Sequence, residues 1–247
     1  MTKPPSREVR AEQVSLFEQA LALDPRFVDA QSWLAIALAS RVGDYMTDTA
    51  AADMSRAEDL TGRALAASPE SHLAHHARGQ VLRMRRRFLE AIPEYETALA
   101  LNRNWVTAIY ALGQCKLFIG SMEDTIPLLE QAIRLSPRDP ALCVWYQQFG
   151  LVHLLQSRVD QAVLWLERVR NAIPTHSSIR SWLASAYALN GETERAFSEL
   201  AEARRLSSDD RYTSLARLRP SSGVPKVRAL IETTYFAGQC KAGMPEE

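Results

Sequence analysis

A pattern of small and apolar positions recurs along most of the chain. A small residue is followed four positions later by an apolar residue and three further on by alanine or valine, and often five beyond that by proline. Such spacings place these positions on one face of a helix, and a proline cannot extend the helix that it follows. The copies are a partial one at Phe17, Ala20 and Pro25, then Ala57/Ala64/Pro69, Ala91/Tyr95/Ala98, Thr125/Leu129/Ala132/Pro137, Ala162/Leu166/Val169/Pro174 and Ala196/Leu200/Ala203.

A second kind of segment precedes each full copy and is built around a small residue. These small residues are Ala35, Gly79, Gly113, Gly150 and Ala184, and all except Gly79 directly follow an apolar residue. Gly79 and Gly113 are 34 residues apart, as are Ala91 and Thr125. Antiparallel helices approach closely only where a side chain is small, so the pattern predicts five helix-turn-helix units over about residues 28 to 208.

These units resemble the tetratricopeptide repeat, whose pattern combines an apolar–Gly pair in a first helix with Ala, an aromatic residue and Pro in a second. Leu112, Gly113, Tyr95, Ala98 and Pro137 are examples of the matching positions. The resemblance implies an all-α fold, a right-handed superhelix (α-solenoid) of about five repeats with a C-terminal capping helix. It also implies a role in binding another protein or a peptide along the concave face.

The domain organisation follows from where this period begins and ends. We expect a disordered tail at 1–7, a partial-repeat helix at 8–24, the array at 25–208 and capping helices with a tail at 209–247. The first repeat is longer than the others, and its insertion falls near 41–54. A final amphipathic helix, Lys226–Lys241, is predicted to cover the exposed end of the last repeat.

Composition narrows the possible functions. The chain has 29 basic and 29 acidic side chains and no net charge, which gives no electrostatic basis for binding nucleic acid or a membrane surface. No apolar run is long enough to span a bilayer, and the first residues do not form a secretory signal. Cys115, Cys143 and Cys240 form no close pair, so a reducing cytoplasm is the expected location.

Two clusters of polar residues are candidates for a metal site and an anion site. His72, His75 and His76 share a helical face, a spacing that can bind a metal, but no carboxylate or cysteine lies at ligand spacing. The basic run Arg83, Arg85, Arg86 and Arg87 is more typical of a solvated helix end than of an anion site. No phosphate-binding loop or catalytic motif occurs. The sequence therefore predicts neither an enzyme nor a bound metal or cofactor.

The resemblance assigns the binding surface to positions next to the small residue of each first helix. Carried onto this chain, the predicted groove is uncharged apart from Arg83 and rich in hydrogen-bonding groups. It comprises His76, Gln80, Arg83, Tyr110, Gln114, Leu117, Gln147, Ser181 and Ser185. Relatives that grip a C-terminal carboxylate use Lys, Asn and Arg at such positions, so binding of chaperone tails is not expected here.

A narrower resemblance concerns the C-terminus. The ending ETTYFAGQCKAGMPEE is similar to the close of repeat arrays in bacterial class III adenylate/guanylate cyclase-like signalling proteins. This implies an alternative role as a regulatory or self-association portion that lacks the catalytic domain. The helix predicted at Glu8–Leu23 has an apolar face and no preceding partner helix, so it is a candidate seam for a homodimer.

Overall fold

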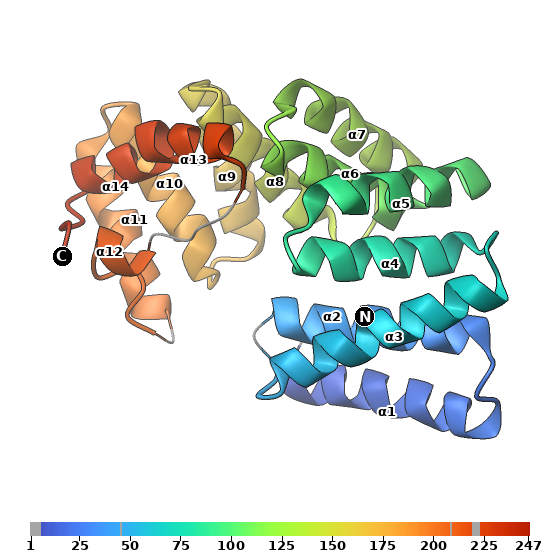
Figure 1. The fold of residues 1–247 in the computed structure, drawn as a ribbon. Coiled ribbons are helices and arrows are strands. Elements are labelled where there is room, and N and C mark those ends of the chain that lie inside the picture. The colour runs from blue at the N-terminus through green and yellow to red at the C-terminus, as the bar shows by residue number, and fades with distance from the viewer. Residues whose placement is uncertain (1–5, 45, 208, 219–222) are drawn as a thin grey trace. The chain divides into compact units, whose positions relative to one another are not determined.

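The computed structural model describes residues 6–44, 46–207, 209–218 and 223–247. It forms two compact units, residues 1–116 and 117–247. The described residues contain helices and no β-strand (Figure 1). The predicted all-helical class and the five helix-turn-helix repeats are confirmed, with first helices α2, α4, α6, α8 and α10 followed by second helices α3, α5, α7, α9 and α11.

In the first unit, helices α1 to α5 each pack against their neighbours in chain order, and α2 also packs against α4 (Figure 1). This is the arrangement that paired antiparallel helices in a repeat array produce. The helices are α1 (Arg7–Leu23), α2 (Val28–Gly43), α3 (Ala50–Ala67), α4 (His72–Met84), α5 (Phe88–Leu101) and α6 (Val106–Phe118), of which α6 continues two residues beyond the first unit.

Helix ends in this unit follow local chemistry. The Ser6 hydroxyl accepts from the Val9 N–H at the start of α1, and the Ser71 hydroxyl accepts from the Ala74 N–H at the start of α4. Both bonds satisfy N–H groups that a helix leaves unpaired. The helix therefore begins at Arg7, inside the tail predicted at 1–7, and residues 1–5 of that tail lie outside the described residues.

The turns inside the second to fifth repeats each have a left-handed residue at a repeating position. Arg86, Gly120, Ser157 and Gly191 have φ angles of 60°, 87°, 57° and 82°. Glycine adopts this conformation without steric cost, whereas Arg86 and Ser157 adopt it against their side chains. The backbone of the turn is thus set by the repeat rather than by the residue present.

The insertion in the first repeat lengthens both of its helices. Helices α2 and α3 contain 16 and 18 residues, against 13 or 14 in the later repeats. The loop between them is organised around Asp53, a buried carboxylate. Asp53 accepts a hydrogen bond from Arg41 Nε at 2.6 Å and one from the Thr47 hydroxyl at 2.7 Å.

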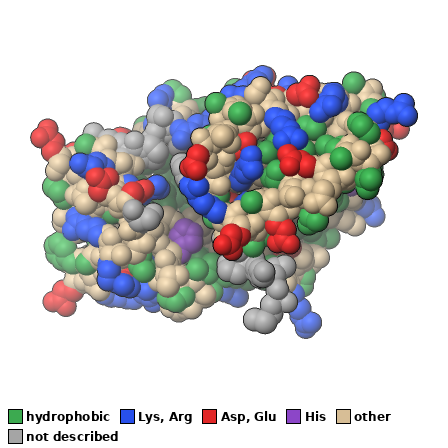
Figure 2. Space-filling model, turned by 90° about the horizontal axis from the view of Figure 1, so that it is seen from below, with side chains coloured by type: hydrophobic (Ala, Val, Ile, Leu, Met, Phe, Trp, Pro, Cys, Tyr) green, Lys and Arg blue, Asp and Glu red, His purple; other side chains and the backbone are tan. Residues whose placement is uncertain are grey.

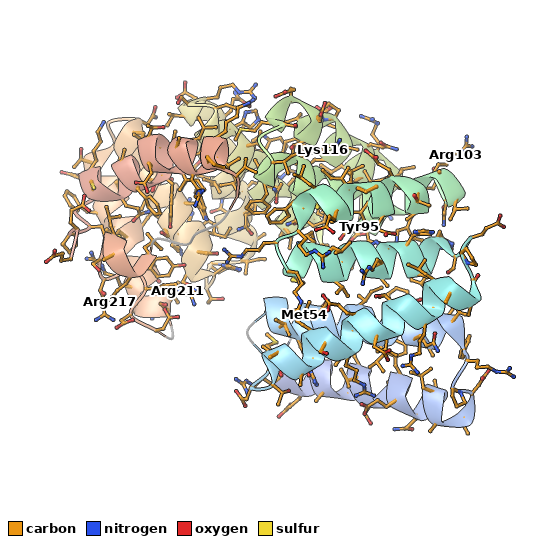
Figure 3. The ribbon with its side chains drawn as sticks, in the orientation of Figure 1. Met54, Tyr95, Arg103, Lys116, Arg211 and Arg217 are labelled. Carbon is orange, nitrogen blue, oxygen red and sulfur yellow. The ribbon has the colours of Figure 1, made fainter. Side chains whose placement is uncertain are left out.

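The close helix contacts occur at the small residues that define the repeat. A Cβ atom at Gly79 would lie 2.8 Å from Cε1 of Tyr95, whose side chain is fully buried. Figure 3 shows Tyr95 between α4 and α5. The contact between Gly79 and Tyr95 is therefore what allows these two helices to nest.

The second unit continues the same architecture and then departs from it. Its repeat helices are α7 (Met122–Leu135), α8 (Leu142–Leu155), α9 (Val159–Ala172), α10 (Ser177–Leu189) and α11 (Thr193–Leu206). After a short helix α12 (Leu215–Leu218), the chain forms one continuous helical segment. It consists of α13 (Pro225–Ile231), a π-helical turn η1 (Glu232–Phe236) and α14 (Ala237–Lys241), and we call residues 225–241 the C-terminal segment.

The C-terminal segment does not lie where it was predicted. It packs against the first-type helices α10 and α8, rather than over the end of the last repeat. The segment is nevertheless amphipathic as predicted, since its apolar stripe is buried at Val227, Ile231, Thr234 and Tyr235. The sequence predicted an amphipathic helix here correctly. It did not predict the surface against which this helix packs, because that depends on which part of the array is not already covered.

Candidate binding surfaces

Four of the predicted groove residues in the first unit form one hydrogen-bonded network, which we call the Arg83 cluster. Arg83 Nη1 donates to Gln114 Oε1 at 2.7 Å, and Arg83 Nη2 donates to Gln80 Oε1 at 3.0 Å. Gln114 Nε2 donates to the Tyr110 hydroxyl at 2.7 Å. All four side chains are half-buried, so the cluster is pre-ordered and still reaches the surface.

The cluster is anchored from beneath. The hydroxyl of buried Tyr95 donates to Gln80 Oε1 at 3.2 Å, which ties the surface network on α4 to the interior of the α4–α5 hairpin. Gln80 and Gln114 thus hold the Arg83 guanidinium from two helices, α4 and α6. A side chain fixed in this way loses little further entropy when a ligand binds to it.

His76 was also predicted to line the groove, and here the structure corrects the prediction. Only 5% of His76 is exposed, and its ring packs against Tyr95 and Trp105 with centroids 5.7 and 5.9 Å apart. Its Nδ1 has no hydrogen-bond partner among the described residues. Burial, with the nearby charges of Arg83 and His72, lowers the pKa of His76 to about 3. His76 is a neutral core residue.

This burial predicts an acid-sensitive stability. His76 stays neutral in the folded chain but takes up a proton in the unfolded chain below about pH 6.5. Its contribution to the free energy of unfolding is therefore complete above that pH and declines as the pH falls toward about 3, with about 2 kcal/mol lost at pH 5. Urea denaturation at pH 7 and pH 5 measures it.

The variant His76→Phe provides the control for this effect. Phenylalanine keeps a ring against Tyr95 and Trp105 but cannot be protonated. Its free energy of unfolding should fall less between pH 7 and pH 5 than that of the wild type, by about the 2 kcal/mol assigned to His76. Equal pH dependence of the two proteins would contradict the assignment.

The other histidines of the cluster have separate partners. His75 Nδ1 lies 2.7 Å from Glu94 Oε2, and its Nε2 lies 2.9 Å from the Pro69 carbonyl oxygen. The His72 ring packs edge-on against Trp105 at 4.6 Å. In the part of the chain that the structure describes, no group of three or more His, Cys, Asp or Glu side chains is placed to hold a metal ion.

The basic run after α4 divides into different roles. Arg85 pairs with Glu58 at 3.1 Å and Arg87 with Glu90 at 2.5 Å, while Arg83 turns into its own cluster. Basic and acidic side chains lie interspersed over the face of the molecule seen in Figure 2. The run is therefore a set of local pairs at a helix end rather than one anion site.

The predicted groove residues of the second unit lie in a different environment. Leu117, Ser181 and Ser185 are fully buried, and Gln147 is half-buried. Ser181 and Ser185 lie beneath the C-terminal segment, whose Tyr235 and Gln239 bond to them. In this structure those serines are covered by the chain itself, which the sequence analysis did not anticipate.

A surface at the start of the first unit, between α1 and α2, includes residues of the helix that the sequence predicted as a candidate homodimer seam. It surrounds a cavity of about 390 Å³ and includes Leu16 and Trp33, which are 56% and 38% exposed. Its lining residues are Arg10, Gln13, Leu16, Phe17, Trp33, Ile36, Ala37 and Ser40, and we call it the α1–α2 surface. The Phe17 and Trp33 rings are stacked with centroids 6.4 Å apart. The part of this surface that α1 contributes was predicted from the apolar face of residues 8–23.

Among the described residues, no helix is both long and apolar enough to cross a membrane. This finding concerns only those helices.

Comparison with known proteins supports the repeat assignment. Residues 50–105 match the sequence model of the tetratricopeptide repeat family. These residues cover α3, α4 and α5 in full, so the match includes Gln80 and Arg83 of the candidate surface. A search of curated protein sequences gave no match.

Several solved structures share the fold. YrrB, described as a tetratricopeptide-repeat protein with an unusual peptide-binding site, is 20% identical, with 79% of this chain and 94% of that chain covered and a TM-score of 0.55. The pilF protein of Pseudomonas aeruginosa is 18% identical, with 87% and 88% covered and a TM-score of 0.62. A chain of the Cut9–Hcn1 hetero-tetramer is 15% identical, with 85% and 39% covered and a TM-score of 0.71.

Proposed function

We propose that this chain is a non-enzymatic module that binds a protein or an extended peptide, since residues 50–105 match the tetratricopeptide repeat family and solved repeat structures share its fold. We propose the Arg83 cluster of the first unit as the binding site. Proteins of this repeat family generally serve as interaction scaffolds. YrrB, which shares the fold, is described as having a peptide-binding site.

The observation that carries this proposal is the way Arg83 is held. Its guanidinium donates to two amide oxygens, Gln80 Oε1 and Gln114 Oε1, and both acceptors are neutral. A half-buried guanidinium between neutral groups is well suited to donate a further hydrogen bond to a carbonyl oxygen of a bound backbone. The amides of Gln80 and Gln114 offer both donors and acceptors to the same backbone.

The test is binding of an extended peptide selected against the purified chain from a random library. The double variant Arg83→Ala/Gln114→Ala should bind the selected peptide at least about tenfold more weakly, since hydrogen bonds to charged groups contribute about 1.5–3 kcal/mol. Fluorescence anisotropy with the labelled peptide measures the dissociation constant.

The matched control is Arg63→Ala, which removes an exposed arginine of α3 that pairs with Asp59 on its own helix. This variant should bind the peptide as the wild type does. If the double variant keeps wild-type affinity while its circular dichroism spectrum is unchanged, the Arg83 cluster is not the binding site.

We further propose that the α1–α2 surface joins two copies of this chain. The positions of α3 that correspond to Arg10, Gln13, Leu16 and Phe17 of α1 are all buried; they are Met54, Ala57, Leu60 and Thr61. In the described residues Leu16 is 56% exposed and Phe17 is half-buried, and a second copy presents the same apolar helix face for a self-complementary contact.

Sedimentation or light scattering of the purified chain should therefore give twice the monomer mass, and Leu16→Glu should give the monomer. Leu89→Glu, at a position of α5 that is 68% exposed, is the control that should leave the mass unchanged. A wild-type monomer at micromolar concentration would reject this proposal.

The relation to cyclase-like signalling proteins and the cytoplasmic location stay predictions from the sequence.

A further inference from the structure

The C-terminal segment lies on the surface of the second unit that corresponds to the predicted groove. It packs along α10, and its π-helical turn also contacts α8. We propose that the C-terminal segment is a built-in ligand of this groove, and that a helical segment of a partner protein with the same apolar and glutamine face binds there in its place. The inference goes beyond the proposed site at the Arg83 cluster and does not depend on it.

The C-terminal segment makes specific polar contacts with α10, as a bound ligand would. The Tyr235 hydroxyl lies 2.5 Å from Ser181 Oγ, and Gln239 Nε2 donates to the Ser181 carbonyl oxygen at 2.6 Å and to Ser185 Oγ at 2.7 Å. The Ser185 hydroxyl donates to the carbonyl oxygen of Tyr235 at 2.8 Å. Ser181 and Ser185 of α10 thus form hydrogen bonds with Tyr235 and Gln239 of the C-terminal segment.

The backbone of the segment is adapted to this contact. Residues 232–236 form a π-helical turn, in which hydrogen bonds run one residue further than in an α-helix. Such turns are frequent at functional sites, because they alter which carbonyl groups a helix presents. Here the turn includes Tyr235, whose carbonyl oxygen accepts from Ser185.

Shape makes the contact selective. A Cβ atom at Gly238 would lie 2.6 Å from both the Cβ and the carbonyl oxygen of Ser185, so only glycine fits at this position. The Tyr235 ring stacks on Trp182 with centroids 3.8 Å apart. A competing helix therefore needs glycine and an aromatic residue three positions before it.

The apolar half of the groove is filled incompletely. A cavity of about 160 Å³ remains between the segment and the first-type helices, lined by Leu117, Phe118, Leu151, Leu155, Trp182, Val227, Ile231 and Tyr235. A partner helix with larger apolar side chains at the positions of Val227 and Ile231 would fill this space. Such a helix gains contacts that the chain's own segment lacks.

The repeats beneath the segment have their own packing. Helices α8, α9, α10 and α11 pack against one another in consecutive pairs, and Leu166, Leu183 and Leu200 are buried in that core. On release of the segment, Ser181 and Ser185 would meet water, which satisfies hydroxyl groups at little cost. The segment's Val227, Ile231 and Tyr235 belong to the same buried cluster as these leucines, so a partner helix must restore the apolar burial that is lost on release.

The test uses the full chain and a synthetic labelled peptide of residues 224–243. In the variant Gly238→Leu the new side chain cannot fit against Ser185, so the segment is expelled and the groove is open. This variant should bind the peptide at least tenfold more tightly than the wild type, whose groove is occupied. A peptide that itself carries Gly238→Leu should not bind.

The matched control chain is Gly62→Leu, because a Cβ atom at Gly62 has nothing within 4 Å. It should bind the peptide as weakly as the wild type. The milder variant Gln239→Ala, which removes the bonds to Ser181 and Ser185, should show intermediate affinity. The double variant Arg83→Ala/Gln114→Ala should leave the affinity for this peptide unchanged. The result of this test therefore does not depend on whether the Arg83 cluster is a binding site.

Hydrogen exchange separates a ligand from a part of the core. In Gly238→Leu, residues 225–241 should lose protection while α8–α11 keep it. Loss of protection in α8–α11 together with the segment, in both Gly238→Leu and Gln239→Ala, would overturn the proposal. So would equal peptide affinity of the wild type and Gly238→Leu, or a segment that stays protected in Gly238→Leu.

Discussion

Replacing Glu199 by alanine should lower the free energy of unfolding by about 3–5 kcal/mol. Glu199 of α11 is buried, and its two carboxylate oxygens accept from Arg170 Nη1 on α9 and Arg180 Nη1 on α10, each at 2.8 Å. Without the carboxylate, two largely buried guanidinium groups lose their shared counter-charge. Urea denaturation followed by circular dichroism measures the loss.

Glu202 provides the comparison within the same helix. Its carboxylate pairs with Arg205 at 2.6 Å, and the Arg205 side chain is 68% exposed. Exposed pairs of this kind contribute about 0–1 kcal/mol, so Glu202→Ala should have a small effect. Equal losses for Glu199→Ala and Glu202→Ala would show that the three-helix contact does not stabilise the second unit.

Replacing Gly150 by leucine should cost about 3 kcal/mol or more, because the α8–α9 contact has no room for a side chain. A Cβ atom alone would lie 2.6 Å from Cγ of Leu166, a fully buried residue of α9. Leucine adds three further carbon atoms to that overlap, so the hairpin must separate. The midpoint of thermal unfolding should fall accordingly.

The contrasting change is Gly62→Leu, in the exposed face of α3. With nothing within 4 Å of its Cβ position, leucine there should stabilise the helix by roughly 0.5–1 kcal/mol, as leucine is the better helix former. The two substitutions are chemically identical and should have opposite signs. The same sign for both would contradict the close-packing role of Gly150.

The two units offer different binding surfaces. In the first unit the Arg83 cluster is half-buried and reaches solvent, so it suits an extended backbone that needs hydrogen-bonding groups. In the second unit Ser181 and Ser185 already hold a helix. If both proposals hold, a single chain binds an extended segment directly and a helical segment only by exchange with its own C-terminal segment.

The candidate site was predictable only in part. The spacing from the small residue of each repeat identified Gln80, Arg83, Tyr110 and Gln114, and the structure brings these four together. The same rule also selected His76, Ser181 and Ser185, which are buried. Repeat position fixes which way a side chain points, but it carries no information about what else packs onto that face.

The amino-acid pattern by itself determined the helices, their pairing and the period, because these depend on contacts between residues close in sequence. Gly79 against Tyr95 and Gly150 against Leu166 are contacts of this kind, each within one hairpin. Only the tertiary structure decided where residues 225–241 dock and which apolar face near α1 stays uncovered. Those outcomes depend on surfaces formed by residues distant in sequence. Ser181 and Gln239, for example, are 58 positions apart and come into contact only in the folded chain.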